Sequence, residues 1–260
     1  MGIVNVTADS FSGDGLADDP ERAVAHGLRL VAEGADLLDI GAESSRPGAV
    51  PVSLDEELRR LIPVIERLSA CGVPLSVDTV KPGVMRAAIA AGAAMINDIN
   101  ALLAPGALET VAGSNAGVCL MHMQGQPSTM QQRPDYADVL GEVADFLRGR
   151  VAAAEQAGIA KSRIVIDPGF GFGKTQEHNL ALFRQLDRIK AIGLPLLVGV
   201  SRKTLLGRIT GSPVERRVHA SVAAALLAAQ RGADILRVHD VAATKDALAV
   251  LSALSPEYRV

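Results

Sequence analysis

The sequence predicts an α/β fold, a single closed barrel of eight parallel strands that alternate with helices, the (β/α) TIM-barrel architecture. Two observations predict it. One unit recurs along the chain: an amphipathic helical stretch, a glycine, a short apolar run and then a polar residue. The apolar runs are continuous, which is typical of strands in a parallel sheet that helices cover. Eight such units in 260 residues fit a closed barrel better than an open, doubly wound sheet, which is the structural alternative.

Each predicted strand is a short apolar run with a polar residue at or near its end. The strands are expected at residues 2–5, 35–40, 73–78, 93–97, 118–122, 163–167, 194–199 and 233–239. A glycine before a strand is expected to close the preceding helix in the left-handed conformation. These glycines are Gly34, Gly72, Gly92, Gly117, Gly158, Gly193 and Gly232. No linker or low-complexity stretch divides the chain, so residues 1–260 are expected to form one domain.

The intervening helices have recognisable start signals. Asp19 followed by Pro20 is typical of an N-cap and a first helical residue, and Ser53 with Glu56 forms a capping box. Helical spacing predicts which side chains face inward. They are Val24, Leu28 and Val31, then Leu54, Leu58, Leu61, Ile65 and Leu68, then Val139, Val143, Phe146, Leu147 and Val151. Two alanine-rich helices, expected at 221–230 and 242–251, are the candidate face for a homodimer.

Composition excludes several classes of protein. The chain is 48% hydrophobic and 21% charged, which indicates a globular core. Aromatic residues make up 3% and the net charge is -3, so neither nucleic acid nor an anionic membrane is an expected partner. Cys71 and Cys119 lack metal-ligand spacing and are expected to stay reduced. The chain shows no signal peptide and no apolar run of about 20 residues, so a cytoplasmic location is expected.

Residues 167–175, Asp-Pro-Gly-Phe-Gly-Phe-Gly-Lys-Thr, resemble a phosphate-binding loop but lack its spacing. A P-loop that ends at Gly173-Lys174-Thr175 requires glycine at position 168, which is proline here. The dinucleotide fingerprint also fails, because the glycines run G-x-G-x-G. Two interpretations stay open: a loop that closely approaches a flat ligand, or an ordinary turn between a strand and a helix.

Polar residues collect at the carboxyl ends of the predicted strands, where barrels of this kind build their active sites. They are Asn5, Asp39, Asp78, Asn97, His122, Asp167, Ser201, Arg202, Lys203, Arg237 and His239. Structural ion pairs are the alternative explanation for any single acid, but they explain three polar residues on three strands much less well. Asp78, Asn97 and Asp167 match the amino-amidine edge of a flat heterocycle such as guanine or pterin. The side chains suited to an anion are Asn5, Arg46, Lys203, Arg237 and His239.

Seven motifs in order carry a resemblance to a known family: residues 2–12, 39–48, 76–79, 96–99, 167–175, 199–203 and 237–239. Together they resemble the dihydropteroate synthases over almost the whole chain. The resemblance implies a transferase of folate biosynthesis. Members join p-aminobenzoate to 6-hydroxymethyl-7,8-dihydropterin pyrophosphate and release pyrophosphate. It also implies Mg²⁺ as cofactor, sulfonamides as inhibitors, small molecules as substrates and a homodimer.

The same resemblance assigns roles to residues of this chain. Pterin is expected to contact Asp78, Asn97, Met121, Asp167, Phe172, Gly199 and Lys203. Pyrophosphate is expected to contact Asn5, Arg237 and His239, with Mg²⁺ at Asn5. p-Aminobenzoate is expected beside Phe11, Ser45, Arg46, Pro47, Phe172 and Thr204. Residues expected to act in catalysis are Asp9, Asp14, Arg46 and Lys203. Arg237 and His239 alternate along a strand, so both are expected on one side and on the pyrophosphate.

The chain departs from the family pattern in its first loop. Family members usually have proline at Ala8, glycine at Ala42 and often threonine at Ser45. The order Gly13-Asp14-Gly15 moves the loop acid by one residue. Relatives also carry an N-terminal lead-in, so a short-start or truncated form is expected. Two other functions stay open: a pterin-dependent methyltransferase acting on a corrinoid protein, and an inactive pterin-binding or partner-regulating paralogue.

Overall fold

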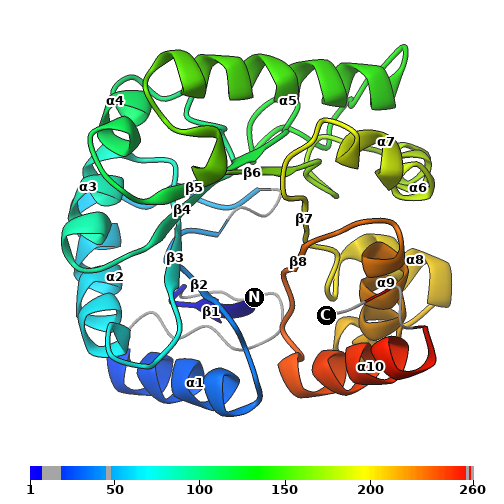
Figure 1. Cartoon of the computed structure of the whole chain (residues 1–260), viewed down its shortest axis with the longest axis horizontal. Coiled ribbons are helices and arrows are strands. Elements are labelled where there is room, and N and C mark those ends of the chain that lie inside the picture. The colour runs from blue at the N-terminus through cyan, green and yellow to red at the C-terminus, as the bar shows by residue number, and fades with distance from the viewer. Residues whose placement is uncertain (8–18, 45–47, 256–257, 259–260) are drawn as a thin grey trace.

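The computed structural model describes residues 1–7, 19–44, 48–255 and 258, and these residues form the predicted barrel (Figure 1). Its strands are β1 (Gly2–Asn5), β2 (Leu38–Gly41), β3 (Leu75–Asp78), β4 (Met95–Asp98), β5 (Gly117–Met121), β6 (Ile164–Asp167), β7 (Leu197–Val198) and β8 (Ile235–Leu236). Strands β1 to β6 pair in parallel in chain order, and β7 pairs with β8. Single bridges, Ile166 to Leu196 and Gly2 to Val238, join the two groups. The barrel is therefore closed.

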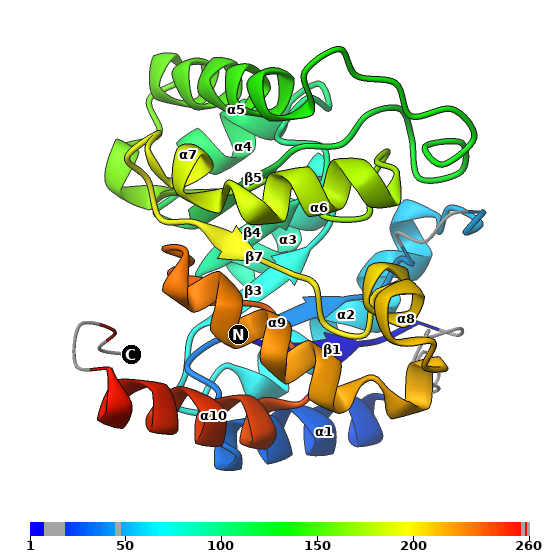
Figure 2. The same cartoon turned by 90° about the vertical axis from the view of Figure 1, so that its right-hand side faces the viewer.

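The helices lie outside the strands, as the side view shows (Figure 2). They are α1 (Pro20–Ala32), α2 (Leu54–Leu68), α3 (Pro82–Ala90), α4 (Ala107–Ala112), α5 (Val139–Gln156), α6 (Gln176–Arg184), α7 (Leu186–Lys190), α8 (Thr204–Thr210), α9 (Val218–Gln230) and α10 (Val241–Leu254). The two alanine-rich helices, α9 and α10, pack against each other. None of the described helices combines the length and the apolar character needed to cross a membrane.

The predicted helix ends are largely confirmed. The side chain of Asp19 accepts a hydrogen bond from the Arg22 amide, and that of Ser53 accepts one from the Glu56 amide. Only this half of the predicted capping box forms among the described residues, because the Glu56 carboxylate accepts from Arg59 and Arg60 instead. Six of the seven predicted glycines have positive φ: Gly34, Gly72, Gly92, Gly158, Gly193 and Gly232. The prediction for Gly117 was wrong, because this residue begins β5 and α4 is instead closed by Gly113.

Most predicted inward-facing residues are buried, but Leu28 and Leu54 are 47% and 43% exposed. The buried face of α1 runs through Ala23, Val24, Gly27 and Leu30, which leaves Leu28 outside it. Gly27 explains the rotation: a Cβ atom there would lie 2.8 Å from Leu68 of α2, so α1 presses its smallest residue against α2. Leu54 is the first residue of α2 and lies at its open end.

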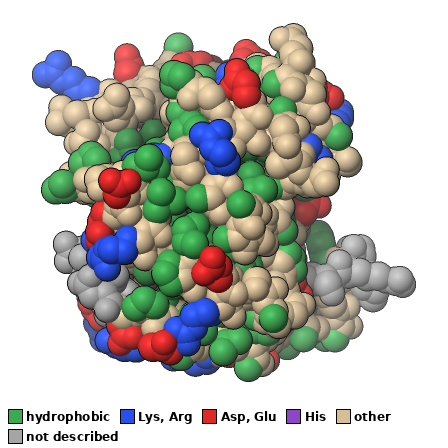
Figure 3. Space-filling model, turned by 90° about the vertical axis from the view of Figure 1, so that its left-hand side faces the viewer, with side chains coloured by type: hydrophobic (Ala, Val, Ile, Leu, Met, Phe, Trp, Pro, Cys, Tyr) green, Lys and Arg blue, Asp and Glu red, His purple; other side chains and the backbone are tan. Residues whose placement is uncertain are grey.

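The outer surface mixes charges. Figure 3 shows the side that carries α2, α3 and α4, where acidic and basic side chains are scattered among hydrophobic and neutral atoms. This pattern agrees with the net charge of -3. The described side chains of that face therefore give no single-sign field that would attract a polyanion.

Candidate active site

The carboxyl ends of the strands open into a cavity of about 450 Å³. It lies where barrels of this kind build their active sites. Eight of the residues to which the resemblance assigns roles line it: Asn5, Asp78, Phe172, Gly199, Lys203, Thr204, Arg237 and His239. The barrel therefore brings together side chains from its first to its last strand.

Three further predicted residues lie at or next to the carboxyl ends of the central strands and are almost fully buried. Asn97, Met121 and Asp167 are 4%, 3% and 6% exposed. Asn97 lies opposite Asp78 in the register of β3 and β4, and Met121 lies opposite Asp167 in that of β5 and β6. These residues are thus neighbours at the carboxyl edge of the barrel, beside the cavity that the mostly buried Asp78 lines.

Asp39 connects several of these residues. Its carboxylate is completely buried and accepts hydrogen bonds from Ser76 Oγ at 2.6 Å and Asn97 Nδ2 at 3.0 Å. Arg237 Nε donates to it at 2.6 Å, and Arg237 Nη2 donates to Asp78 Oδ2 at 3.1 Å. The sequence indicated Asp39 only as a polar strand end. Its contacts show that it orients Asn97 and Arg237.

Burial controls the electrostatics of the floor. It raises the pKa of Asp78 to about 7, an effect that Arg237 opposes. Burial also raises the pKa of Asp167, against the effects of Lys203 and the Gly169 amide. For Lys203, burial lowers the pKa to about 8, although Asp167 favours the charged form. The site therefore holds groups that exchange protons near neutral pH.

Lys203 and Phe172 form one wall of the cavity. Lys203 Nζ donates to the carbonyl oxygen of Phe170 at 2.5 Å and lies 4.7 Å from the centre of the Phe172 ring. Thr204 follows as the first residue of α8. Burying the ammonium against a ring and a carbonyl fixes it at the cavity edge. An aromatic ligand would find a cation, a ring and a hydroxyl side by side.

The glycine-rich loop after β6, residues 168–175, packs closely against the loop that follows β5. Gly169, Gly171 and Gly173 have φ values of 67°, 81° and 59°. A Cβ atom at Gly169 would overlap the carbonyl oxygen of His122, and one at Gly173 would overlap that of Gln124. Two of the three glycines are therefore explained by a tight turn against the loop after β5. Only Gly171 lines the cavity.

Lys174 was missed as a site-building residue. It is 3% exposed, and its Nζ contacts His122 Nδ1 at 2.9 Å, the Gly169 carbonyl at 2.9 Å and the Phe172 carbonyl at 3.0 Å. Burial lowers its pKa to about 7 and that of His122 to about 3. His122 is thus a structural partner of Lys174. The only sequence signal was the Gly-Lys pair, which the P-loop comparison had dismissed.

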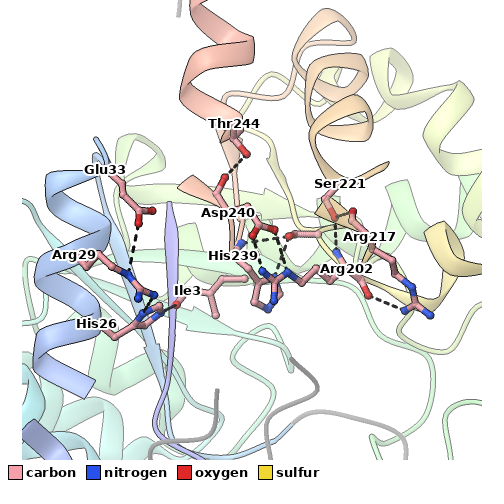
Figure 4. Close-up of polar contacts among 11 residues, drawn as sticks. Ile3, His26, Arg29, Glu33, Arg202, Arg217, Ser221, His239, Asp240 and Thr244 are labelled. Atoms are coloured by element: carbon pink, nitrogen blue, oxygen red, sulfur yellow. Dashed lines mark hydrogen bonds and ion pairs between the residues drawn. The ribbon is translucent and has the colours of Figure 1, made fainter. Parts of the chain in front are cut away.

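The rim carries groups suited to an anion. His239 Nδ1 lies 3.0 Å from Ser201 Oγ, and the next residue, Asp240, pairs with Arg202 (Figure 4). The side chain of Asn5 has no hydrogen-bond partner in the described part of the chain. Within that part, no group of three or more His, Cys, Asp or Glu side chains is placed to hold a metal ion. Asn5 and Arg237 line the same cavity as His239.

Six predicted residues lie outside the described residues: Asp9, Phe11, Asp14, Ser45, Arg46 and Pro47. The altered position Ala8 does too. The described chain does reach the cavity just before the second of these gaps, because Glu43 and Ser44 line it.

Fold and site together define a class. This is a (β/α) barrel with a cavity at its mouth that is lined by Asp78 and by the cations Lys203 and Arg237, while the buried Asn97 and Asp167 lie at neighbouring strand ends. The chemistry of these groups suits a flat, donor-rich heterocycle next to an anion.

Comparison with known proteins narrows this class. The model of the family described as "Pterin binding enzyme" matches residues 1–239. The dihydropteroate synthase of Neisseria meningitidis serogroup B is 52% identical over 98% of this chain and 92% of its own. The Yersinia pestis dihydropteroate synthase, solved with a sulfonamide drug, superimposes with a TM-score of 0.96 at 47% identity, over 98% and 94% of the chains.

The Xanthomonas albilineans dihydropteroate synthase is also similar. Its structure with 4-aminobenzoic acid has a TM-score of 0.91 at 60% identity, over 98% of this chain and 92% of that one. Its complex with 7,8-dihydropteroate has a TM-score of 0.87 at 55% identity, over 98% of this chain and 91% of that one. The chain therefore belongs to the dihydropteroate synthase family of pterin-binding enzymes, as the motifs had indicated. Its activity is that of the family, a transferase step of the folate pathway.

Proposed function

We propose that the chain condenses 6-hydroxymethyl-7,8-dihydropterin pyrophosphate with p-aminobenzoate, giving 7,8-dihydropteroate and pyrophosphate, in the cavity at the barrel mouth. One observation supports this most directly: the acid Asp78 and the cations Lys203 and Arg237 line a single cavity, and Arg237 donates to Asp78. A substrate that joins a pterin to a pyrophosphate requires both. The Xanthomonas albilineans relative, which holds 4-aminobenzoic acid or 7,8-dihydropteroate, supports the choice of the second substrate and the product.

The pterin is assigned to the floor. Asp78 and Asp167 accept hydrogen bonds from the ring N–H groups, and Asn97 offers a carbonyl oxygen and one remaining amide N–H. Asn97 is suited to this because its other N–H is fixed by Asp39. Further pterin contacts are proposed for Met121, Phe172, Gly199 and Lys203.

The pyrophosphate is assigned to Asn5, Arg237 and His239, with Mg²⁺ at Asn5. Mg²⁺ usually takes one or two protein oxygens and completes its shell with phosphate oxygens and water. The unpartnered amide of Asn5 on the cavity fits such a single contact. When bound, the ion would neutralise charge on the leaving pyrophosphate. Arg237 and His239 stabilise the same charge from the protein side.

p-Aminobenzoate is assigned to the wall formed by Lys203, Phe172 and Thr204, together with Phe11, Ser45, Arg46 and Pro47. We assign Asp9, Asp14, Arg46 and Lys203 to catalysis. An aniline nitrogen is weakly basic, so it needs little assistance to attack. A dissociative path, in which pyrophosphate leaves before the attack, follows from the strong neutralisation of the leaving group and the electron-rich dihydropterin.

Incubation of the protein with pterin pyrophosphate and labelled p-aminobenzoate tests the function. We expect labelled dihydropteroate and stoichiometric pyrophosphate. Pterin binding without product would support the inactive paralogue. A separate incubation with a methylated tetrahydropterin as donor and a corrinoid protein as acceptor tests the methyltransferase. The cations at the rim favour the synthase over both, since only the synthase must bind pyrophosphate.

For assembly and location, we propose a homodimer in the cytoplasm. The packed pair α9 and α10 exposes Leu227, Val250 and Leu254, which supports its use as the dimer face. Both cysteines are free thiols, which agrees with a reducing compartment. Sedimentation of the purified chain tests the dimer.

Asp167→Asn should weaken pterin binding and leave the fold intact. Asp167 Oδ1 accepts the Gly169 amide at 2.7 Å, whereas its Oδ2 has no hydrogen-bond partner among the described residues. Losing a charged hydrogen bond costs about 1.5–3 kcal/mol, so calorimetry should show affinity for the pterin substrate reduced roughly 10- to 150-fold. Asp98→Asn is the control, because Asp98 is buried but already accepts two backbone amides. If Asp167→Asn binds the pterin substrate as tightly as the wild type, the assignment of Asp167 to pterin binding is wrong.

Pterin affinity should depend on the protonation of Asp78. Burial raises the pKa of this group to about 7, and pterin N–H donors favour the carboxylate. Affinity should therefore rise with pH up to about 7, by as much as tenfold per unit, and then level off. The measurement is calorimetry of hydroxymethyl-dihydropterin at pH values from about 1.5 units below to about 1.5 units above this pKa. Asp78→Asn should remove this rise, and a flat wild-type profile would contradict the role.

A further inference from the structure

The loops after β7 and β8 are joined by side chains where their backbone pairing ends. The two strands pair through only two positions each, Leu197 with Ile235 and Val198 with Leu236. One more backbone bond follows, from Arg237 N to the carbonyl of Val198. Beyond this bond the two segments carry candidate substrate-binding residues, so contacts other than the backbone pairing of the sheet must hold the segments in register.

Two side-chain contacts take over that task. Ser201 Oγ lies 3.2 Å from the His239 amide and 3.0 Å from His239 Nδ1. One residue further, the Arg202 guanidinium makes a two-point ion pair with Asp240, with Nη2 to Oδ1 at 2.5 Å and Nε to Oδ2 at 3.0 Å. The pairs 201 with 239 and 202 with 240 thus extend the register of β7 and β8.

Arg202 is also held on its backbone. Its φ is 56°, a left-handed conformation that L-residues other than glycine rarely adopt. Its amide donates to Ser221 Oγ at 2.9 Å, and its carbonyl accepts from Arg217 Nη1 at 3.0 Å. Figure 4 shows Arg202 with Asp240 on one side and Ser221 and Arg217 on the other. Strained residues persist only where their surroundings hold them, and such strain clusters at functional sites.

The neighbours of this ion pair give it a functional consequence. Arg202 directly precedes Lys203, which contacts Phe170 and Phe172, and Asp240 directly follows His239. The ion pair is only partly exposed, with side chains at 21% and 16%, so solvent screens it less than a surface pair. A shift at either residue would therefore move a group of the Lys203 wall or of the anion rim.

We propose that Arg202 is a positioning residue, which acts through its ion pair with Asp240 to fix the distance between Lys203 and His239. It thereby couples the p-aminobenzoate side of the cavity to the pyrophosphate side. This inference rests on the roles proposed above for Lys203 and His239. A misplacement of reacting groups by about 1 Å can cost roughly a hundredfold in rate, so a clamp between the two walls has a large effect on turnover.

The test uses Arg202→Gly, Asp240→Asn and the double variant. Glycine fits the φ of 56° without strain, so Arg202→Gly should fold and isolates the loss of the guanidinium. The matched control is Lys190→Ala. Lys190, the last residue of α7, pairs with Asp234 at 2.5 Å, so this ion pair lies before β7 and β8, at the end of the strands opposite the cavity. Readouts are kcat/KM for p-aminobenzoate, the affinity for pyrophosphate with Mg²⁺ by calorimetry, and the denaturation midpoint.

Each single variant should lose roughly 10- to 100-fold in kcat/KM and also bind pyrophosphate more weakly. The double variant should be no worse than either single one, because one interaction is lost in all three. Lys190→Ala should leave kcat/KM and the pyrophosphate affinity unchanged. A shifted midpoint with unchanged kinetics would overturn the inference in favour of a structural role. If kcat/KM falls in Arg202→Gly but not in Asp240→Asn, the inference is overturned, because Arg202 would then act by direct contact with the substrate. A wild-type protein without turnover would instead refute the proposed function, while pyrophosphate binding would still test the clamp.

Discussion

Arg237→Ala should reduce the free energy of unfolding by about 3–5 kcal/mol and abolish measurable turnover. The guanidinium donates to Asp39 and to Asp78, and Asp39 is completely buried. Removing the cation leaves a buried carboxylate without its charged partner, which is the costliest way to break an ion pair. The same change removes a proposed pyrophosphate contact and the cation that opposes protonation of Asp78.

Urea denaturation and ligand calorimetry would measure both effects. The loss of stability should be smaller at pH 5.5 than at pH 8, because protonation neutralises Asp78 in the variant. Arg67→Ala is the control, since Arg67 forms an exposed ion pair with Glu21 and should change stability little. The sequence predicted that Arg237 serves the pyrophosphate rather than the pterin. Its contact with Asp78 leads us to expect weaker binding of both ligands, and an intact pterin affinity would restore the original prediction.

Gly169→Ala should have the second largest effect, a loss of about 2–4 kcal/mol in unfolding free energy. The residue has a φ of 67°, which costs an L-residue strain, and a Cβ atom would overlap the His122 carbonyl. That carbonyl cannot retreat freely, because Lys174 Nζ binds both it and the carbonyl of Gly169. The loop that carries Phe172 would therefore shift, and affinity for p-aminobenzoate should fall with stability.

Gly149→Ala provides the matched control. Gly149 lies within α5, and a Cβ atom there would meet nothing within 4 Å. Alanine in the middle of a helix should stabilise the protein by about 0.5–1 kcal/mol. Opposite signs for the two substitutions are the expected result. If both glycines tolerate alanine equally, the close approach at Gly169 does not constrain the loop.

The fold and most of the site are already visible in the sequence. Eight apolar runs alternate with helical stretches, and this local periodicity predicted every strand of the barrel. Because the carboxyl ends of the strands in such a barrel meet at one end, polar strand ends such as Asp78 and Asn97 could be grouped without knowing any contact. Eight of the residues to which the resemblance assigns roles do line one cavity. The motif resemblance added their proposed roles.

The tertiary structure alone decided which charge meets which. Asp39 and Arg237 are 198 residues apart, and no local pattern marks Asp39 as the residue that orients Asn97. Lys174 was dismissed because its motif fails as a P-loop, yet it holds the loops after β5 and β6 together.

The same holds for the pair of Arg202 and Asp240, which no spacing rule connects. The physical reason is the sequence separation over which each feature is determined. Periodicity and strand ends are properties of a few neighbouring residues, and the sequence determines them directly. The partner of a buried charge is selected by closure of the barrel, which places loops from distant units side by side and leaves each buried ion to the nearest opposite charge.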